Sequence, residues 1–144
     1  MSITVRNMLD IKGRDVVAVS PGKSFLEGAR VLHEKRTGAV VVTSVEGRVA
    51  GIFTERDLVR AMAEKGGEVL DEPVSSRMTV SVQKCREETT VNQLMEMMSA
   101  GRFRHVPVEE GNRLVGIISI GDVVKSRIRE VELEAEQIKA YIAG

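Results

Sequence analysis

The sequence predicts an α+β fold made of two pseudo-symmetric repeats, each running strand, helix, strand, strand, helix. The chain aligns with itself, because residues 23–42 match 89–108 at an offset of 66. "GIFTERD" from Gly51 likewise matches "GIISIGD" from Gly116 at an offset of 65. Apolar residues also switch between strand and helix spacing in the same order in both halves. A chain of 144 residues fits one ordinary domain or two small ones that share a core.

The first repeat begins with a short apolar run, "VVAV" at 16–19, that is typical of a strand. Apolar residues at helical spacing from Phe25 predict a helix, and "GAVVVT" returns to a strand at 38–43. The segment "SVEGR" predicts a hairpin turn into a third strand, "RVAGIFT" at 48–54. A second helix follows from Glu55 and ends at the Gly-Gly pair.

The second repeat follows the same plan. We expect strands at 80–85, 104–108 and 113–119, a helix from Val91, and a long last helix from about Val123 to Ile142. Pro73 breaks the connecting segment. The predicted organisation is a first repeat with the N-terminal segment at 1–68, a linker at 69–74, and a second repeat with an extended C-terminal helix at 75–144.

Composition excludes several function classes. The 21 basic residues balance 21 acidic ones, so the net charge provides no field for nucleic acid or acidic membranes. The longest apolar runs are too short to cross a bilayer, and no signal segment opens the chain. The lone Cys85 cannot form an internal disulfide, and two histidines are too few for a three-histidine zinc site. We therefore expect a cytoplasmic protein that needs no metal and is not an enzyme.

The repeated hydroxyl-x-x-Asp motif has two interpretations. Thr54 with Asp57, and Ser119 with Asp122, stand where a strand meets a helix, as in a capping box. Alternatively, the helix N-terminus and the hydroxyl bind a phosphate, and the carboxylate accepts hydrogen bonds from the ribose hydroxyls. Both interpretations stay open from the residues alone, because a duplicated fold would also duplicate its caps.

The chain resembles a pair of cystathionine-β-synthase (CBS) domains, or Bateman module. The resemblance rests on tandem halves that carry "RHVPV" and the motif Gly, two apolar residues, Ser or Thr, two variable residues and Asp. The first half departs from it, with "TGAVVV" in place of "RHVPV". The resemblance implies a regulatory module whose halves pack sheet to sheet and leave two clefts for AMP, ADP, ATP, S-adenosylmethionine or NAD. AMP is the first choice among these ligands.

The resemblance also implies a set of nucleotide-binding residues. In the second half Arg104 and His105 offer donors to phosphate, and in the first half Arg56 is the cationic candidate. The full candidate set is Thr54, Arg56, Asp57, Arg104, His105, Val106, Pro107, Ser119, Asp122, Gly38, Ala39 and Val40. Two alternatives remain, namely a purely structural or interaction dimer whose ligand sites are only caps, and a thiol-linked regulator acting through Cys85.

The last helix carries an apolar stripe that predicts a homodimer. Its members recur at steps of 4, 3, 4, 3 and 4, which is the spacing of coiled-coil core positions. They are Val124, Ile128, Val131, Ala135, Ile138 and Ile142. The alternative is that the stripe packs on its own domain. Beyond a second copy, we expect a downstream protein partner that receives the nucleotide signal.

Overall fold

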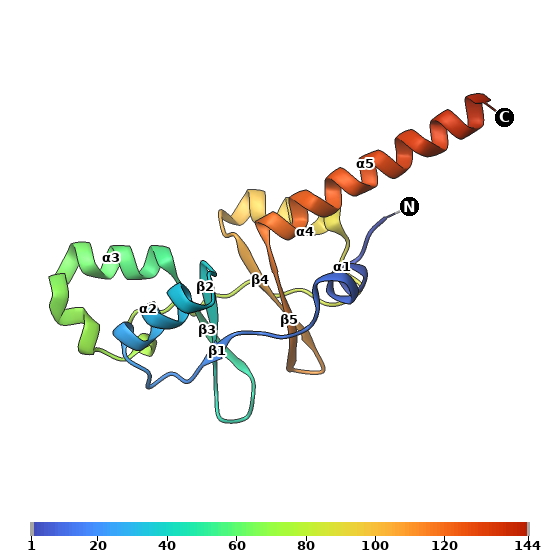
Figure 1. The fold of residues 1–144 in the computed structure, drawn as a ribbon. Coiled ribbons are helices and arrows are strands. Elements are labelled where there is room, and N and C mark those ends of the chain that lie inside the picture. The colour runs from blue at the N-terminus through green and yellow to red at the C-terminus, as the bar shows by residue number, and fades with distance from the viewer. Residues whose placement is uncertain (1, 144) are drawn as a thin grey trace. The chain divides into compact units, whose positions relative to one another are not determined.

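The computed structural model describes residues 2–143, which fall into two compact units (Figure 1). One unit spans Asp15–Gln83 with the short segment Gly111–Val115, and we call it the first-repeat unit. The other combines the N-terminal segment up to Arg14 with Lys84–Glu110 and the chain from Gly116 onward, and we call it the second-repeat unit. The predicted α+β fold with two repeats is confirmed.

The first-repeat unit has the predicted element order. Its elements are β1 (Ala18–Val19), α2 (Phe25–Glu34), β2 (Ala39–Thr43), β3 (Val49–Thr54) and α3 (Glu55–Lys65). The three strands form one sheet in the order β1-β2-β3, with β1 parallel and β3 antiparallel to β2. The antiparallel register sets Ala39 opposite Thr54, so the start of β2 lies beside the end of β3.

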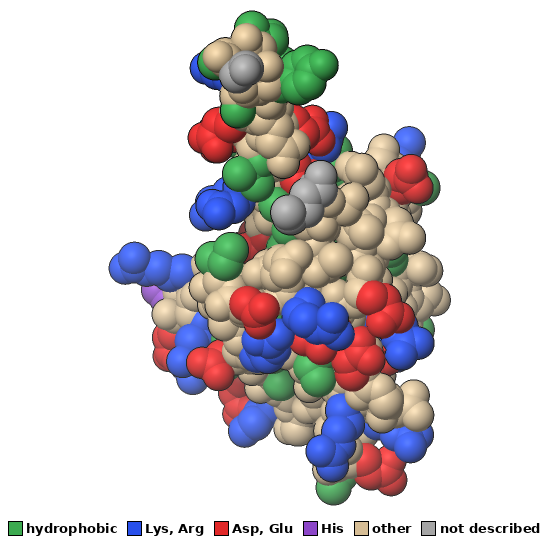
Figure 2. Space-filling model, turned by 90° about the vertical axis from the view of Figure 1, so that its right-hand side faces the viewer, with side chains coloured by type: hydrophobic (Ala, Val, Ile, Leu, Met, Phe, Trp, Pro, Cys, Tyr) green, Lys and Arg blue, Asp and Glu red, His purple; other side chains and the backbone are tan. Residues whose placement is uncertain are grey.

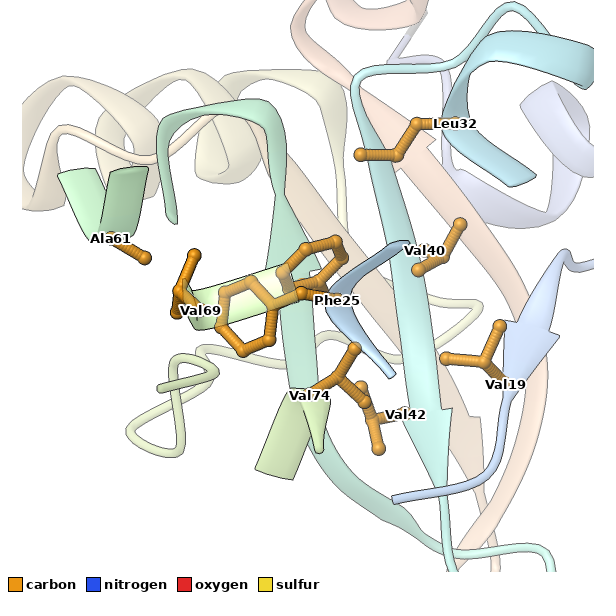
Figure 3. Packing of buried hydrophobic residues seen from close by; sticks show 9 residues of the cluster. Val19, Phe25, Leu32, Val40, Val42, Ala61, Val69 and Val74 are labelled. Atoms are coloured by element: carbon orange, nitrogen blue, oxygen red, sulfur yellow. The ribbon is translucent and has the colours of Figure 1, made fainter. Parts of the chain in front are cut away.

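The core of this unit is aliphatic around one aromatic pair (Figure 3). The rings of Phe25 and Phe53 meet edge to face with centroids 5.1 Å apart. Two core valines lie in the segment 69–74 that was expected to be a linker, namely Val69 in η1 (Gly66–Asp71) and Val74 in η2 (Val74–Ser76). Both are fully buried, so this connection is part of the packed unit.

The second-repeat unit carries the remaining helices and a two-stranded sheet. Its elements are α1 (Val5–Lys12), α4 (Val91–Gly101), β4 (His105–Glu110), β5 (Arg113–Ser119, whose first residues count with the first-repeat unit) and α5 (Ile120–Ala143). The expected helices from Val91 and through Val123–Ile142 are confirmed.

The N-terminal helix α1 belongs to the second-repeat unit, although it precedes the first repeat in the chain. The amides of Val5 and Arg6 donate to the carbonyls of Thr89 and Glu87, both at 2.8 Å, and the side chain of Leu9 is fully buried. The expected end of the first repeat at residue 68 stays a prediction. The two compact units change instead after Arg14 and after Gln83, with Gly111–Val115 counted in the first-repeat unit.

The predicted strand at 80–85 is wrong. Of these residues only Cys85 pairs with a strand, through a parallel bridge to Val108. Before it, the amide of Val82 donates to the carbonyl of Val80 at 2.9 Å, which turns the backbone locally instead of extending it along a ladder. Val80 is 67% exposed, so its apolar side chain is not packed in the core as that of an inward-facing strand residue would be.

Candidate functional site

The first hydroxyl-x-x-Asp motif forms a capping box at the start of α3. The Thr54 hydroxyl accepts from the amide of Asp57 at 3.1 Å, and Oδ2 of Asp57 accepts from the amide of Thr54 at 3.0 Å. Thr54 is extended, with φ −117° and ψ 163°, because it is the last residue of β3 as well as the cap. The capping interpretation is therefore confirmed for the first repeat.

The carboxylate of Asp57 is also held by a residue that is distant in sequence. The Thr79 hydroxyl lies 3.2 Å from Oδ1 and 3.4 Å from Oδ2 of Asp57. Thr79 is itself fixed by two 2.9 Å backbone hydrogen bonds with Ile52 of β3. A guanidinium nitrogen of Arg60 lies 3.6 Å from Oδ1. Both oxygens of this carboxylate therefore have partners, and its side chain is only 3% exposed.

The second motif repeats the cap at the start of α5. The amide of Ser119 donates to Oδ2 of Asp122 at 2.9 Å, and the amide of Asp122 donates to the Ser119 hydroxyl at 3.2 Å. The Ser119 hydroxyl also donates to Oδ2 at 3.0 Å. The same local geometry therefore exists in both repeats, as the offset of the two motifs predicts.

A lysine from α1 completes the second junction. The ammonium of Lys12 lies 2.7 Å from Oδ2 of Asp122 and donates to the carbonyl of Ile117 at 2.9 Å. Burial alone raises the pKa of Asp122, but the hydrogen bonds from Lys12 and from the Ser119 amide outweigh it, so the pKa lies below its ordinary value. Asp122 is therefore a carboxylate at neutral pH.

The two carboxylates differ in how much acceptor capacity they keep. The hydrogen bonds that Lys12 and Ser119 donate to the carboxylate of Asp122 all end on Oδ2, and neither residue donates to Oδ1. The side chain of Asp122 is 23% exposed, against 3% for Asp57. A ligand hydroxyl can therefore donate to Oδ1 of Asp122 without displacing Lys12 or Ser119, whereas at Asp57 it must compete with Thr79.

Thr79 and Lys12 are the residues that the sequence analysis missed. The offset of 66 pairs Lys12 with Met78 and Gly13 with Thr79, so the two anchors are neighbours in the repeat but not equivalent. Each lies in the segment that leads into one repeat, and each holds the carboxylate of the other repeat's motif. The repeat offset was the signal that the sequence offered. It could not show that Lys12 and Thr79 each contact the motif of the other repeat, because those contacts depend on the tertiary fold.

The start of the preceding strand lies beside each motif. The carbonyl of Gly38 accepts from the amide of Glu55 at 3.0 Å, and that of Arg104 accepts from the amide of Ile120 at 2.8 Å. The candidates adjoining these two positions are buried, except His105, which is half-buried; the buried ones are Ala39, Val40, Val106 and Pro107. The structure thus brings these candidates to the two strand-to-helix junctions.

Arg56 and Arg104 have exposed side chains, and no described residue forms an ion pair with either. The structure therefore assigns these two guanidinium groups no structural partner. Arg56 is the second residue of α3, between Glu55 and Asp57, whose amides donate to Gly38 and Thr54, and Arg104 immediately precedes β4. The anion-binding roles of Arg56 and Arg104 stay predictions.

Cys85 is buried, and burial raises the pKa of its thiol to about 12. A thiol with such a pKa is almost wholly protonated at neutral pH and is a poor nucleophile. Among residues 2–143 no three His, Cys, Asp or Glu side chains gather in a way suited to a metal ion. No helix in the same range is long and apolar enough to cross a membrane.

Comparison with known proteins gives consistent matches over most of the chain. A family model described as "CBS domain" matches residues 9–64 and 74–129. A crystal structure of a CBS-domain containing protein from Agrobacterium tumefaciens is 57% identical, with a TM-score of 0.85, over 88% of this chain and 95% of that one. A protein of Acidianus ambivalens is 36% identical over 112 residues, which is 77% of this chain and 66% of the relative.

One solved relative contains a nucleotide. A CBS domain protein from Pyrobaculum aerophilum, whose structure is a complex with AMP, is 27% identical with a TM-score of 0.79. The match covers 92% of this chain and 99% of that one.

Proposed function

This chain belongs to the CBS domain family, with two CBS domains in tandem, and we propose that it is a regulatory sensor of an adenosine nucleotide. The nucleotide binds at the strand-to-helix junctions, and its occupancy is passed to a protein partner. AMP is the first candidate ligand, since a relative that is 27% identical was solved with AMP, and ADP, ATP and NAD offer the same adenosine.

The observation that carries the proposal is that Lys12 and Ser119 hold Asp122 through one oxygen, Oδ2. An ionised carboxylate oxygen accepts hydrogen bonds from the adjacent 2′ and 3′ hydroxyls of a ribose. Lys12 and Ser119 fix the carboxylate through Oδ2, and in this proposal the ribose hydroxyls donate to Oδ1. Capping and ligand binding are thus compatible in one side chain.

Charge near the same junction suits a phosphate. The start of α5 is the positive end of the helix dipole, and Lys12 adds an ammonium beside it, although the amides of Ile120 and Asp122 already donate to Arg104 and Ser119. Arg104 supplies an exposed guanidinium at the start of the neighbouring strand. A ligand with both a ribose diol and a phosphate therefore satisfies more of this junction than adenosine alone.

The first-repeat junction is the weaker of the two sites in this proposal. A ribose hydroxyl there must displace the Thr79 hydroxyl from a carboxylate that is 3% exposed. Breaking a hydrogen bond to a charged group costs about 1.5 to 3 kcal/mol, and the new bond from the ribose only replaces it. We therefore expect one tight site, at Asp122, and one weak site, at Asp57.

The alternative is a structural or interaction protein in which the two motifs are caps alone, and the confirmed capping boxes favour it directly. A thermal shift with AMP, ADP, ATP and NAD separates the two functions, with GMP as a control for the base. A ligand at about 100 times its dissociation constant adds roughly 2.7 kcal/mol of stability. A melting temperature unchanged by all four adenosine ligands would leave only the structural function.

We also propose that the chain forms a homodimer through α5. The apolar stripe predicted from the sequence is exposed, with Val124, Ile128 and Val131 each about half exposed. The alternative is that the half-covered part of the stripe packs on its own unit, where α5 contacts α4. Light scattering tests this proposal, because a monomer at micromolar concentration would contradict it.

A further inference from the structure

The exposed stripe on α5 continues to the end of the described chain. Ile138 and Ile142 are 60% and 78% exposed, and every residue from Glu134 to Ala143 is exposed. Figure 2 shows apolar side chains on the surface of the C-terminal part of this helix, near the top of the view. Apolar side chains repeated at this spacing need a covering surface, which one helix does not provide.

A different face of α5 packs on its own unit. Val123 is 1% exposed, and Glu130 is 3% exposed with its carboxylate accepting from the amide of Ile3 at 2.8 Å. Arg127 donates to the other oxygen of Glu130 at 3.1 Å. The helix is therefore already anchored without the stripe, which leaves the stripe free for a second molecule.

The spacing of the stripe fixes the coiled-coil positions. With 3 residues from a to d and 4 from d to a, the a positions are Ile128, Ala135 and Ile142, and the d positions are Val124, Val131 and Ile138. The flanking e positions are then Lys125, Glu132 and Lys139, and the g positions are Arg127, Glu134 and Tyr141. In coiled coils the e and g charges set partner choice and orientation.

A parallel pair in register brings together only opposite charges at these positions. Each g residue then faces the e residue five positions later in the partner helix, so Arg127 faces Glu132 and Glu134 faces Lys139. Arg127 also donates to Glu130 of its own helix, so part of its donor capacity is not available to Glu132 of the partner helix. The pair of Glu134 with Lys139 is therefore the main determinant of the parallel orientation.

An antiparallel pair brings like charges together. With Ile128 opposite Ile138, the e positions face one another and set Lys125 against Lys139, and Glu132 against its own copy. The g positions then set Glu134 against its own copy. Like charges at facing positions are destabilising, so the charge pattern disfavours this arrangement.

We infer that two copies of this chain associate through a parallel, in-register, two-stranded coiled coil formed by the α5 stripe. The inference rests on the proposed homodimer and adds its orientation. Parallel helices bring the two α5 N-termini to the same end of the coiled coil, and each N-terminus carries an Asp122 junction. The two proposed nucleotide sites of this type then lie at one end of the dimer interface.

Cysteine cross-linking tests the orientation directly. In a parallel pair the two copies of residue 142 are adjacent, so Ile142→Cys forms an intermolecular disulfide under mild oxidation. In an antiparallel pair residue 142 lies opposite residue 124, about 27 Å along the helix from its own copy at 1.5 Å per residue, and no disulfide forms. Glu136→Cys, at an exposed b position, is the matched control, and the buried Cys85 does not compete.

Charge reversal gives a second, independent readout. Lys139→Glu faces Glu134 in a parallel pair, and we expect the dissociation constant of the dimer to rise roughly 5- to 30-fold at low salt. Adding Glu134→Lys restores the attraction and the affinity, whereas Glu136→Lys changes neither. In an antiparallel pair Lys139→Glu would face Lys125 and would strengthen the dimer.

The outcomes separate the two proposals. A wild-type chain that stays monomeric in sedimentation overturns the homodimer itself. A wild-type dimer that gives no disulfide at residue 142 and is strengthened by Lys139→Glu overturns only the parallel orientation. A dimer that cross-links at residue 142 and is weakened by Lys139→Glu supports both.

Discussion

Replacing Lys12 by methionine tests the charged contact that distinguishes the second junction from the first. Met78 stands at the equivalent position of the other repeat, so methionine keeps an unbranched chain there and removes the ammonium. The ammonium lies 2.7 Å from Oδ2 of Asp122, with the two side chains 33% and 23% exposed. At this exposure solvent screens the pair, and its loss costs about 1 kcal/mol or less.

The pH dependence of this cost identifies its origin. The pKa of Asp122 is lowered in the folded chain, so its ionisation stabilises the fold above the unfolded pKa of about 3.9, and the effect is lost as pH falls through the folded value. In Lys12→Met, burial still raises the pKa of Asp122. The hydrogen bond from Lys12, which is the largest contribution that lowers this pKa, is lost. The stability difference between variant and wild type is therefore largest near pH 7 and shrinks as pH falls below the unfolded pKa.

Differential scanning calorimetry at pH 7, 5, 3 and 2 measures this difference. At pH 7 we expect the melting temperature of the variant to fall by about 2 to 8 °C for each kcal/mol lost. Lys35→Met is the control, since Lys35 is exposed and no described residue forms an ion pair with it. A difference of the same size at pH 2 as at pH 7 would refute the assignment to the Asp122 carboxylate.

Three further predictions concern other contacts. Gly51→Ala sets a Cβ 2.8 Å from the carbonyl oxygen of Thr79 and should cost about 1 to 3 kcal/mol in chemical denaturation. Gly121→Ala meets nothing closer than 3.6 Å and should stabilise by up to about 1 kcal/mol; equal costs for the two would contradict this packing. Thr79→Val frees the carboxylate of Asp57, so AMP affinity at the first junction should rise in calorimetric titration; a fall would make Thr79 a ligand contact. Cys85 should resist thiol reagents at pH 8 until the chain is unfolded, because burial raises its pKa to about 12; rapid labelling of the native protein would contradict that.

Local features of the fold could be predicted from the sequence, since they depend on residues close together in the chain. The hydroxyl and the acid three positions later give the capping boxes at Thr54 and Ser119, because a cap involves one helical turn. Apolar spacing gives α2 and α4 for the same reason. The repeat then extends each local prediction to the other half.

Features that depend on distant partners could not be predicted. Nothing local shows that α1 donates to the carbonyl of Thr89, or that Lys12 reaches Asp122. The strand expected at 80–85 failed because apolar alternation alone does not provide a partner ladder, and only Cys85 finds one. Val74 was missed as a core residue because a single valine after a proline carries no periodicity.

The candidate site was predicted in its residue types but not in its asymmetry. Sequence equivalence suggests two similar carboxylates, since both motifs share their spacing. The structure makes them unequal, because a hydroxyl occupies both oxygens of Asp57 while an ammonium occupies one oxygen of Asp122. That difference arises from the tertiary placement of Thr79 and Lys12.

The most direct test of the proposed function is calorimetric titration of AMP into the wild type, Asp122→Asn and Asp57→Asn. Asparagine keeps the size and one acceptor oxygen but loses the charge. If Asp122 binds the ribose, Asp122→Asn weakens the tight site about 10- to 150-fold, as the loss of a hydrogen bond to a charged group requires, while Asp57→Asn leaves that site almost unchanged. If both variants bind AMP as the wild type does and only melt lower, the motifs are caps and the sensor function is contradicted.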